Sequence, residues 1–100
     1  MVKGKTKSGI KFQLNERIKD DARFVFYYAK AQDKNATPEE QASAMMGFLR
    51  LFFGSDEGIL QFMDAVAAVH DGVCDNEAMM AEISEMLEAL NAKNSSSSPQ

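Results

Sequence analysis

The chain has one cysteine, one histidine, no tryptophan and two prolines among its 100 residues. A lone cysteine, Cys74, cannot form an internal disulfide, which fits a reducing compartment. No apolar run approaches the roughly 20 residues that cross a bilayer. The first residues are basic but lack the apolar stretch of a secretory signal. We therefore expect a cytosolic protein that has no contact with a membrane.

The sequence also offers little that would support catalysis. His70 and Cys74 are four residues apart, but Asp71-Gly72 between them should break a helix, so we expect a helix-end histidine beside a small buried thiol. One histidine and one cysteine cannot complete a structural zinc site. Residues 71–82 have the length of a calcium-binding loop but lack the glycine that its sixth position requires. We expect no enzymatic activity, no cofactor and no metal.

The net charge of −4 hides an uneven distribution. Residues 1–35 hold nine Lys/Arg and four Asp/Glu, a balance of +5, whereas residues 36–100 hold two and eleven, a balance of −9. Segregation of this kind can steer association, including head-to-tail contact between identical subunits. It also fits a basic patch for nucleic acid, or two solvated faces without a partner.

Residues 2–14 predict a β-hairpin. Ile10, Phe12 and Leu14 alternate with polar residues, which is the period of a half-buried strand. Residues 7–9 supply the turn. Because a two-stranded hairpin is marginal alone, it must pack on helices or join another strand.

From about residue 15 the apolar period becomes helical. It predicts a first helix to about residue 32, because Ile18, Ala22, Val25 and Ala29 recur at helical spacing. Thr37 is the predicted N-cap of a second helix, with Pro38 in its first turn and Glu40 completing a capping box. That helix should end at Gly54.

Two further helices follow. Ser55 can cap a third helix that closes near Gly72, with Ile59, Met63, Val66 and Ala67 along it. Asp75 or Asn76 can cap a fourth, whose apolar residues keep helical spacing: Met79, Met80, Ile83, Met86, Leu87 and Leu90.

The fold class that these patterns predict is mainly α, with about four helices in a small compact domain. An N-terminal β-hairpin arm spans residues 1–14 and the helical domain spans residues 15–92. Residues 93–100 form a flexible, disordered C-terminal tail, since they are serine-rich and lack apolar groups to order them.

The helices carry more apolar surface than one core requires. Residues 24–28 are all apolar or aromatic, and residues 45–53 hold seven Met, Phe and Leu side chains. At about 100° per residue these seven cover well over half of the helix circumference, whereas a typical apolar stripe covers about 100°. Large exposed apolar patches mark partner surfaces, and methionines suit adaptable interfaces. The alternative is a Phe-rich core with the second helix fully covered. The partner-binding residues we predict are Phe24, Phe26, Tyr28, Phe48, Phe52 and Phe53.

Two segments carry a resemblance to a known family. The opening segment comprises residues 4–9, Phe12, Asn15-Glu16, Asp20-Asp21 and Arg23-Phe24. The closing segment is an acidic helix over residues 85–90 followed by Lys93 to Pro99. Both resemble the tail assembly chaperones of long-tailed bacteriophages and prophages of low-GC Gram-positive hosts. The middle departs from that family, since residues 45–53 are unusually aromatic and the later helices lack basic residues.

The resemblance implies a non-enzymatic protein of the host cytoplasm that is absent from the mature virion. Such chaperones bind and solubilise the tape measure protein while tail tube protein polymerises around it, and they self-associate. The implied partners are therefore the tape measure protein, the tail tube protein and further copies of the chain, with no nucleic acid. Many are also made in a longer form by ribosomal frameshifting, and Ala92-Lys93-Asn94 can be encoded by GCA AAA AAC, which contains a slippery heptamer.

The competing interpretation is a small nucleic-acid-binding regulator. The lysines of the hairpin would contact phosphates and Tyr27 or Tyr28 would stack on bases; these lysines are Lys3, Lys5, Lys7 and Lys11. Against it, the chain is acidic overall and no helix has a clustered basic face. An antitoxin-like helical partner protein is a further alternative.

Overall fold

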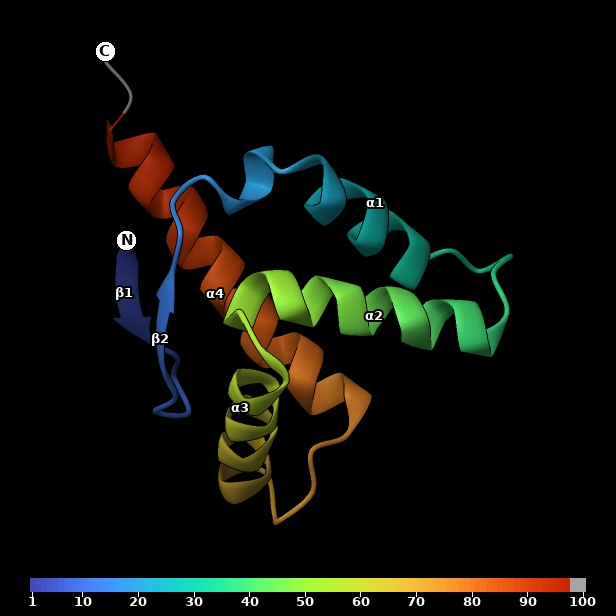
Figure 1. Ribbon diagram of the computed structural model, residues 1–100. Helices are drawn as coiled ribbons and strands as arrows, with labels where there is room; N and C mark the ends of the chain where they lie inside the picture. The colour runs from blue at the N-terminus through green and yellow to red at the C-terminus, as the bar shows by residue number, and fades with distance from the viewer. Residues whose placement is uncertain (98–100) are drawn as a thin grey trace. The chain divides into compact units, whose positions relative to one another are not determined.

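The computed structural model describes residues 1–97, with side chains for residues 1–92. The elements are β1 (Val2–Lys5), β2 (Lys11–Leu14), a 3-10 turn η1 (Ile18–Asp20), α1 (Ala22–Ala31), α2 (Pro38–Phe53), α3 (Asp56–Val69) and α4 (Asn76–Ser97) (Figure 1). The predicted fold class of four helices after an antiparallel hairpin is confirmed.

The chain divides into two units, and the boundary falls within α3. One unit, Arg17–Ile59, contains η1, α1 and α2. The other joins the hairpin segment, Met1–Glu16, to the chain from Leu60 onward, which includes α4. Residues far apart in sequence therefore build the second unit, and we describe each unit separately.

The hairpin forms as its alternation predicts. Gly9 has a φ of 97° in the turn, a conformation that glycine adopts at little cost. Ile10 and Leu14 are buried, while Phe12 is half-buried. Gly4 lies opposite Phe12, and a Cβ at Gly4 would come within 2.8 Å of that ring. The missing side chain of Gly4 therefore makes room for the phenyl ring.

α2 begins and ends at the predicted residues. Thr37 Oγ1 accepts a hydrogen bond from the Glu40 backbone N–H at 3.1 Å, and Glu40 Oε1 accepts one from the Thr37 N–H at 2.9 Å. Pro38 is the first helical residue. Gly54 ends the helix with a φ of 82° and donates its N–H to the carbonyl of Arg50 at 2.8 Å. The capping box and the glycine stop are both confirmed.

The first helix begins later than predicted. Asp21 is extended, and its Oδ1 accepts a hydrogen bond from the Arg23 backbone N–H at 2.8 Å, so that α1 starts only at Ala22. Residues 18–20 form a separate 3-10 turn before it. A short carboxylate competes with the helix for backbone N–H groups, which explains why Asp21 divides the run that apolar spacing had joined.

The apolar residues whose spacing predicted this helix do not form its buried face. Of these four residues, Ile18 is buried, whereas Val25 is 59 % exposed and Ala29 is exposed. α1 instead buries Phe24 and half-buries Tyr28, one turn further along. The larger rings provide more apolar area than valine and alanine, and that area determines which face of the helix packs inward.

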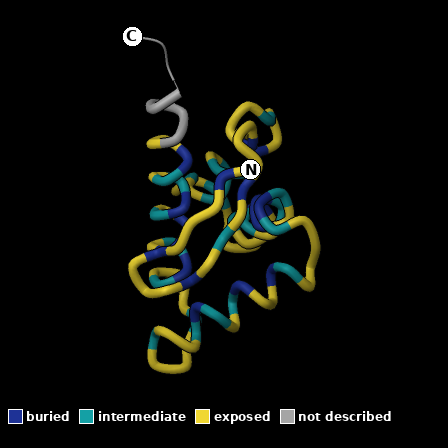
Figure 2. Tube along the Cα trace, turned by 90° about the vertical axis from the view of Figure 1, so that its left-hand side faces the viewer, coloured by how far each residue is buried: buried dark blue, intermediate teal, exposed yellow. Residues whose placement is uncertain are grey.

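α3 and α4 follow the predicted caps. The Ser55 hydroxyl accepts from the Gly58 N–H at 3.0 Å, and Asp75 Oδ1 accepts from the Ala78 N–H at 2.7 Å. Along α4 the predicted stripe is confirmed, since Met79, Ile83, Met86 and Leu90 are buried and Met80 and Leu87 are half-buried. Figure 2 shows these buried positions recurring turn by turn along α4.

The C-terminal boundary differs from the prediction. α4 has 22 residues and continues to Ser97, past the predicted start of the tail at Lys93. The last part of the predicted tail, residues 98–100, lies outside the described residues. Among the helices of residues 1–97, none has the combined length and apolarity that a bilayer crossing demands.

Thr37→Ala should lower the free energy of unfolding by about 1 kcal/mol, because the variant loses the side-chain acceptor of the α2 N-cap. Urea unfolding followed by circular dichroism measures this. Ser43→Ala, at an exposed position within the same helix, is the matched control and should change stability by less than about 0.5 kcal/mol. Equal stability of the Thr37 variant and the wild type would show that the capping box contributes nothing.

Candidate protein-binding site

Aromatic side chains of α1 and α2 pack on one another within the Arg17–Ile59 unit. The ring centroid of Phe48 lies 5.3 Å from that of Phe24, 5.6 Å from that of Tyr28 and 5.0 Å from that of Phe52. Centroid separations in this range are those of favourable aromatic pairs. Phe24, Phe48 and Phe52 are 6 %, 1 % and 6 % exposed, so this cluster is interior packing.

The six predicted partner-binding residues therefore fall into different environments. Three of them are buried in the aromatic cluster, two are half-buried and one is at the surface. The buried residues are Phe24, Phe48 and Phe52, the half-buried residues are Tyr28 and Phe53, and the surface residue is Phe26, which is 64 % exposed. Helix–helix packing takes up much of the apolar surplus that the sequence indicated. A direct role in binding stays a prediction, and Phe26 is the best placed for it.

Phe26 borders an open groove between α1 and α2. The groove has a volume of about 340 Å³ and is lined by Phe26, Tyr27 and Lys30 of α1 and by Glu39, Glu40, Ser43 and Ala44 of α2. The rings of Phe26 and Tyr27 meet edge to face, with centroids 5.7 Å apart. Tyr27 lies directly over Gly47, where a Cβ would approach its ring to 2.6 Å. Gly47 therefore allows the aromatic wall of the groove to lie close to α2.

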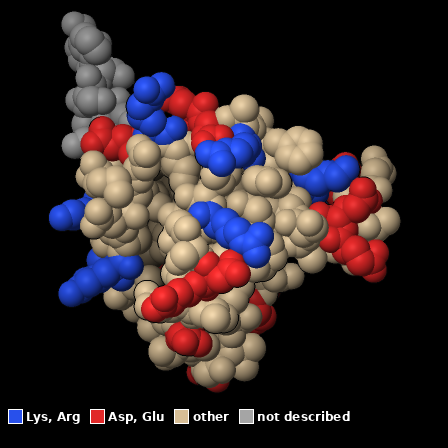
Figure 3. All heavy atoms as spheres, viewed as in Figure 1, with Lys and Arg blue, Asp and Glu red and all other residues tan. Residues whose placement is uncertain are grey.

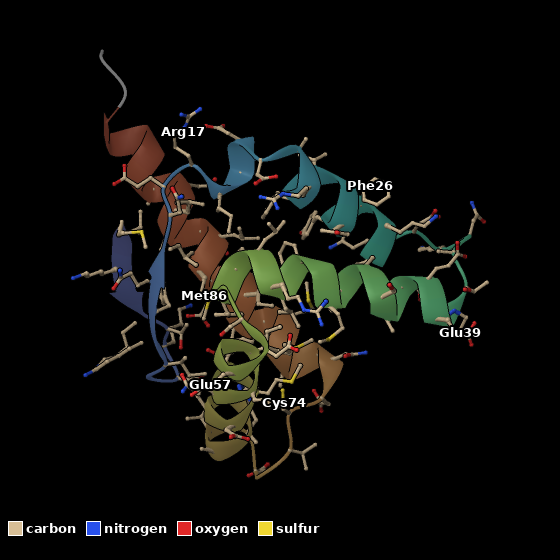
Figure 4. All side chains as sticks on the ribbon, viewed as in Figure 1. Arg17, Phe26, Glu39, Glu57, Cys74 and Met86 are labelled. Carbon is tan, nitrogen blue, oxygen red and sulfur yellow. The ribbon has the colours of Figure 1, made fainter. Side chains whose placement is uncertain are left out.

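A second hollow, of about 500 Å³, lies along α1 and shares Phe26 and Lys30 with the first. Val25, Ala29 and Asp33 complete its lining. Three surface residues of α1 form an apolar strip that we call the Phe26 ridge: Val25, Phe26 and Ala29. All three line the second hollow, and Phe26 lines the groove as well. Figure 4 labels Phe26 on the outer side of α1.

The rim of the groove is charged. Lys30 Nζ lies 3.6 Å from Glu40 Oε2, and this ion pair links α1 to α2. The pKa of Glu40 is below its ordinary value, chiefly because the Thr37 backbone N–H donates to its carboxylate, with a smaller effect from the positive charge of Lys30. Glu39 adds a second carboxylate to the lining. An apolar wall with charges of both signs at its rim suits an amphipathic helix.

The other unit holds a buried carboxylate that the sequence reasoning missed. Glu82 of α4 is 1 % exposed, and its Oε2 lies 2.9 Å from Nε2 of His70. Burial raises the pKa of Glu82, but the Thr6 hydroxyl, the His70 imidazole and the Ser8 hydroxyl more than offset this, so the pKa lies below its ordinary value. Oε1 has no hydrogen bond of regular geometry to any described residue, although both hydroxyls approach the carboxylate.

Glu85, one turn further along α4, also binds the hairpin turn that carries Thr6 and Ser8. Its Oε1 accepts a hydrogen bond from the Lys7 backbone N–H at 2.8 Å. Thr6 is buried, and its Oγ1 accepts from the Ile10 N–H at 3.2 Å. Glu82 and Glu85 therefore attach the Thr6–Ile10 turn to α4. One signal was available in the sequence, because Glu82 falls at helical spacing within the apolar stripe of α4.

This polar cluster does not have the features of a nucleophilic site. His70 is bound to Glu82, and burial, followed by the charge of Asp75, raises the pKa of the Cys74 thiol. A raised pKa leaves the thiol protonated near neutral pH, and the protonated thiol is a poor nucleophile. Across residues 1–97, no three His, Cys, Asp or Glu side chains gather in a way that could hold a metal ion.

Comparisons with known proteins identified no relative: no family model, no curated protein and no solved structure matches this chain. The resemblance to tail assembly chaperones therefore stays a prediction from the opening and closing segments of the sequence.

Glu82→Gln should lower the free energy of unfolding by about 1–3 kcal/mol near pH 7, because the variant loses a buried charged acceptor. The folded-state pKa of Glu82 is lowered, so its contribution is present above the ordinary carboxyl pKa and is lost as the pH falls through the folded value. The stability difference between wild type and variant should therefore shrink as the pH falls from about 7 to about 3.

Urea unfolding at a series of pH values measures that difference. Glu88→Gln, at an exposed position of the same helix, is the control and should follow the wild type throughout. A Glu82 variant that is as stable as the wild type near neutral pH would show that the buried carboxylate does not stabilise the hairpin turn.

Proposed function

We propose that this protein is a tail assembly chaperone of the long-tailed phage type, which binds and solubilises the tape measure protein while the tail tube polymerises. The observation that carries the proposal is the Phe26 ridge beside the open groove of α1 and α2. The resemblance of the opening and closing segments suggests which partner this surface takes. The role requires binding and no catalysis.

The groove suits an apolar, helical partner. A tape measure protein is long and helical and has apolar stretches, as the resemblance implies. A helix laid in the groove would place its apolar side chains on Phe26 and Tyr27 and its polar side chains near Lys30 and Glu39. Covering a phenyl group that is 64 % exposed contributes on the order of 1–2 kcal/mol, so one ridge gives weak and reversible binding.

The groove has no arrangement typical of an active site. Its titratable side chains are Tyr27, Lys30, Glu39 and Glu40, and Lys30 pairs with Glu40. No Ser–His or Cys–His pair faces the groove, since its lining contains neither histidine nor cysteine. Binding is therefore the function that the described residues of the groove support.

The nucleic-acid alternative is weaker in this structure. Both tyrosines that were expected to stack on bases are engaged in packing within the α1–α2 unit. Tyr27 lies over Gly47, and Tyr28 stacks on Phe24 with ring centroids 5.8 Å apart. Neither ring is fully exposed.

Phe26→Asp should weaken binding of a tape measure segment at least about tenfold, because a carboxylate at the centre of the ridge would be desolvated by an apolar helix. Its helicity and unfolding midpoint should match those of the wild type, since the ring packs mainly at the surface. Co-expression with the tape measure protein, followed by co-purification and titration, provides the measurement.

Leu60→Asp is the matched control, because Leu60 is 61 % exposed on α3 and lies outside the ridge. It should bind the tape measure segment like the wild type. Undiminished binding by the Phe26 variant would exclude the ridge as the binding surface, and binding by neither wild type nor control would exclude the proposed partner.

A second test concerns the family and does not depend on the ridge. The gene, tagged at its N-terminus and expressed with its native downstream DNA, should yield a minor, longer product if ribosomes slip at the codons of Ala92 to Asn94. Silent changes that remove the heptamer should abolish that product. A single product from the native gene would count against the frameshifting type of chaperone.

A further inference from the structure

The hairpin presents a strongly basic face. Residues 1–14 contain Lys3, Lys5, Lys7 and Lys11 and no Asp or Glu, and all four lysines are exposed. Side chains alternate between the two faces of a strand, so Lys3, Lys5 and Lys11 lie on the face opposite the buried Leu14. We call these three residues the lysine face. Figure 3, drawn in the view of Figure 1, shows basic side chains projecting where the hairpin lies.

The lysine face is left without compensating charge in the chain. Lys5 is directly opposite Lys11, an arrangement of like charges that disfavours strand pairing. None of its three lysines forms an ion pair with a described residue. All three arginines do form one: Arg17 with Asp20, Arg23 with Asp21 and Arg50 with Asp56. The lysines of this face are therefore available to an acidic group from outside the chain.

The face also has a shape that can receive a partner. A hollow of about 510 Å³ is lined by Lys3, Gly4, Lys5, Lys11, Phe12 and Gln13. The hollow therefore has cationic groups at several points around its lining, with the glycine between them. A small apolar side chain flanked by carboxylates would match it.

The connection between α3 and α4, together with the first residues of α4, has that chemistry. Residues 71–77, which we call the acidic loop, contain three exposed carboxylates, Asp71, Asp75 and Glu77. Val73 lies between them and is 59 % exposed. Asp75 caps α4, while Asp71 and Glu77 form no ion pair with any residue that the structure describes.

We infer that the lysine face of one copy of this chain binds the acidic loop of a second copy. Residues 36–100 carry a balance of −9, which attracts the basic hairpin of another copy and repels a polyanion such as nucleic acid. The two surfaces differ, so the contact is head-to-tail and repeats from copy to copy, into a ring or a filament. It does not depend on the proposed function, because no tape measure protein takes part.

Sedimentation velocity in about 50 mM and about 500 mM salt tests this contact, because exposed ion pairs are screened at the higher concentration. The wild type should sediment as multiples of 11.1 kDa at low salt and as a monomer at high salt. Lys5→Glu/Lys11→Glu should weaken self-association at least about tenfold at low salt. Lys34→Glu, an exposed charge change outside the hairpin, should associate like the wild type.

A mixing experiment identifies the acidic counterpart. Asp71→Asn/Glu77→Lys removes the net negative charge of the loop, with asparagine chosen because residue 71 has a φ of 58° and asparagine tolerates it. Asp75 is retained because it caps α4. This variant and the Lys5→Glu/Lys11→Glu variant should each be monomeric alone, and should form a 1:1 complex when mixed, since the loop variant keeps its lysine face and the hairpin variant keeps its acidic loop.

Three results would overturn the inference: a wild type that is monomeric at low salt, hairpin variants that associate as well as the wild type, or a mixture that stays monomeric. A labelled single-stranded 30-mer oligonucleotide is added in a parallel gel shift. Salt-sensitive binding of it that the Lys5→Glu/Lys11→Glu variant loses would make nucleic acid the occupant of this face. Circular dichroism of each variant confirms that a lost association is not a lost fold.

Discussion

The buried carboxylate of Glu82 is the interaction on which the unit containing the hairpin depends. A charge in the interior is costly unless hydrogen bonds and a partner offset the cost, and here His70, Thr6 and Ser8 supply them. The apolar residues of the hairpin would tolerate several alignments on α4, whereas contacts from Glu82 and Glu85 to one turn select a single one. With that alignment fixed, Leu14 points inward and the lysines point outward.

In the other unit, the periodicity of α1 determines which aromatic side chains can bind a partner. Residues 24–28 are five consecutive apolar or aromatic residues, and at about 100° per residue they cannot all face α2. Phe24 and Tyr28 join the ring of Phe48, which turns Val25 and Phe26 to the opposite side. The aromatic interior and the exposed ridge are thus two results of the same packing.

Sequence reasoning succeeded at most local determinants, misread one of them, and failed at contacts between residues far apart in the chain. The capping box of Thr37 and the glycine stop at Gly54 involve residues at most four apart in the chain, so their chemistry is readable from sequence. The start of α1 was misplaced because apolar spacing was given more weight than Asp21, which is also a local signal. By contrast, the partners of Glu82 and Glu85 in the hairpin lie more than seventy residues away, and no local pattern encodes that approach.

The candidate site shows the same difference between local and tertiary determinants. The sequence predicted a surplus of aromatic side chains, but only the packing of α1 on α2 shows that Phe48 and Phe52 are interior and that Phe26 is not. The face of α1 that packs depends on which residues α2 offers, and Gly47 is decisive because it admits the ring of Tyr27. That choice is tertiary, so a single helix pattern could not have resolved it.

The Phe26 ridge offers apolar contact, whereas the lysine face offers electrostatic attraction. This difference suits a protein that acts in many copies. The Phe26 ridge is small, so one copy holds an apolar segment only weakly. Copies joined through contacts between the lysine face and the acidic loop would present ridges in series, so that each further ridge binds a partner already held nearby. A long apolar protein would then be held firmly by the array and released when the array comes apart. Under this arrangement the hairpin would govern the strength of binding through the number of copies that it joins.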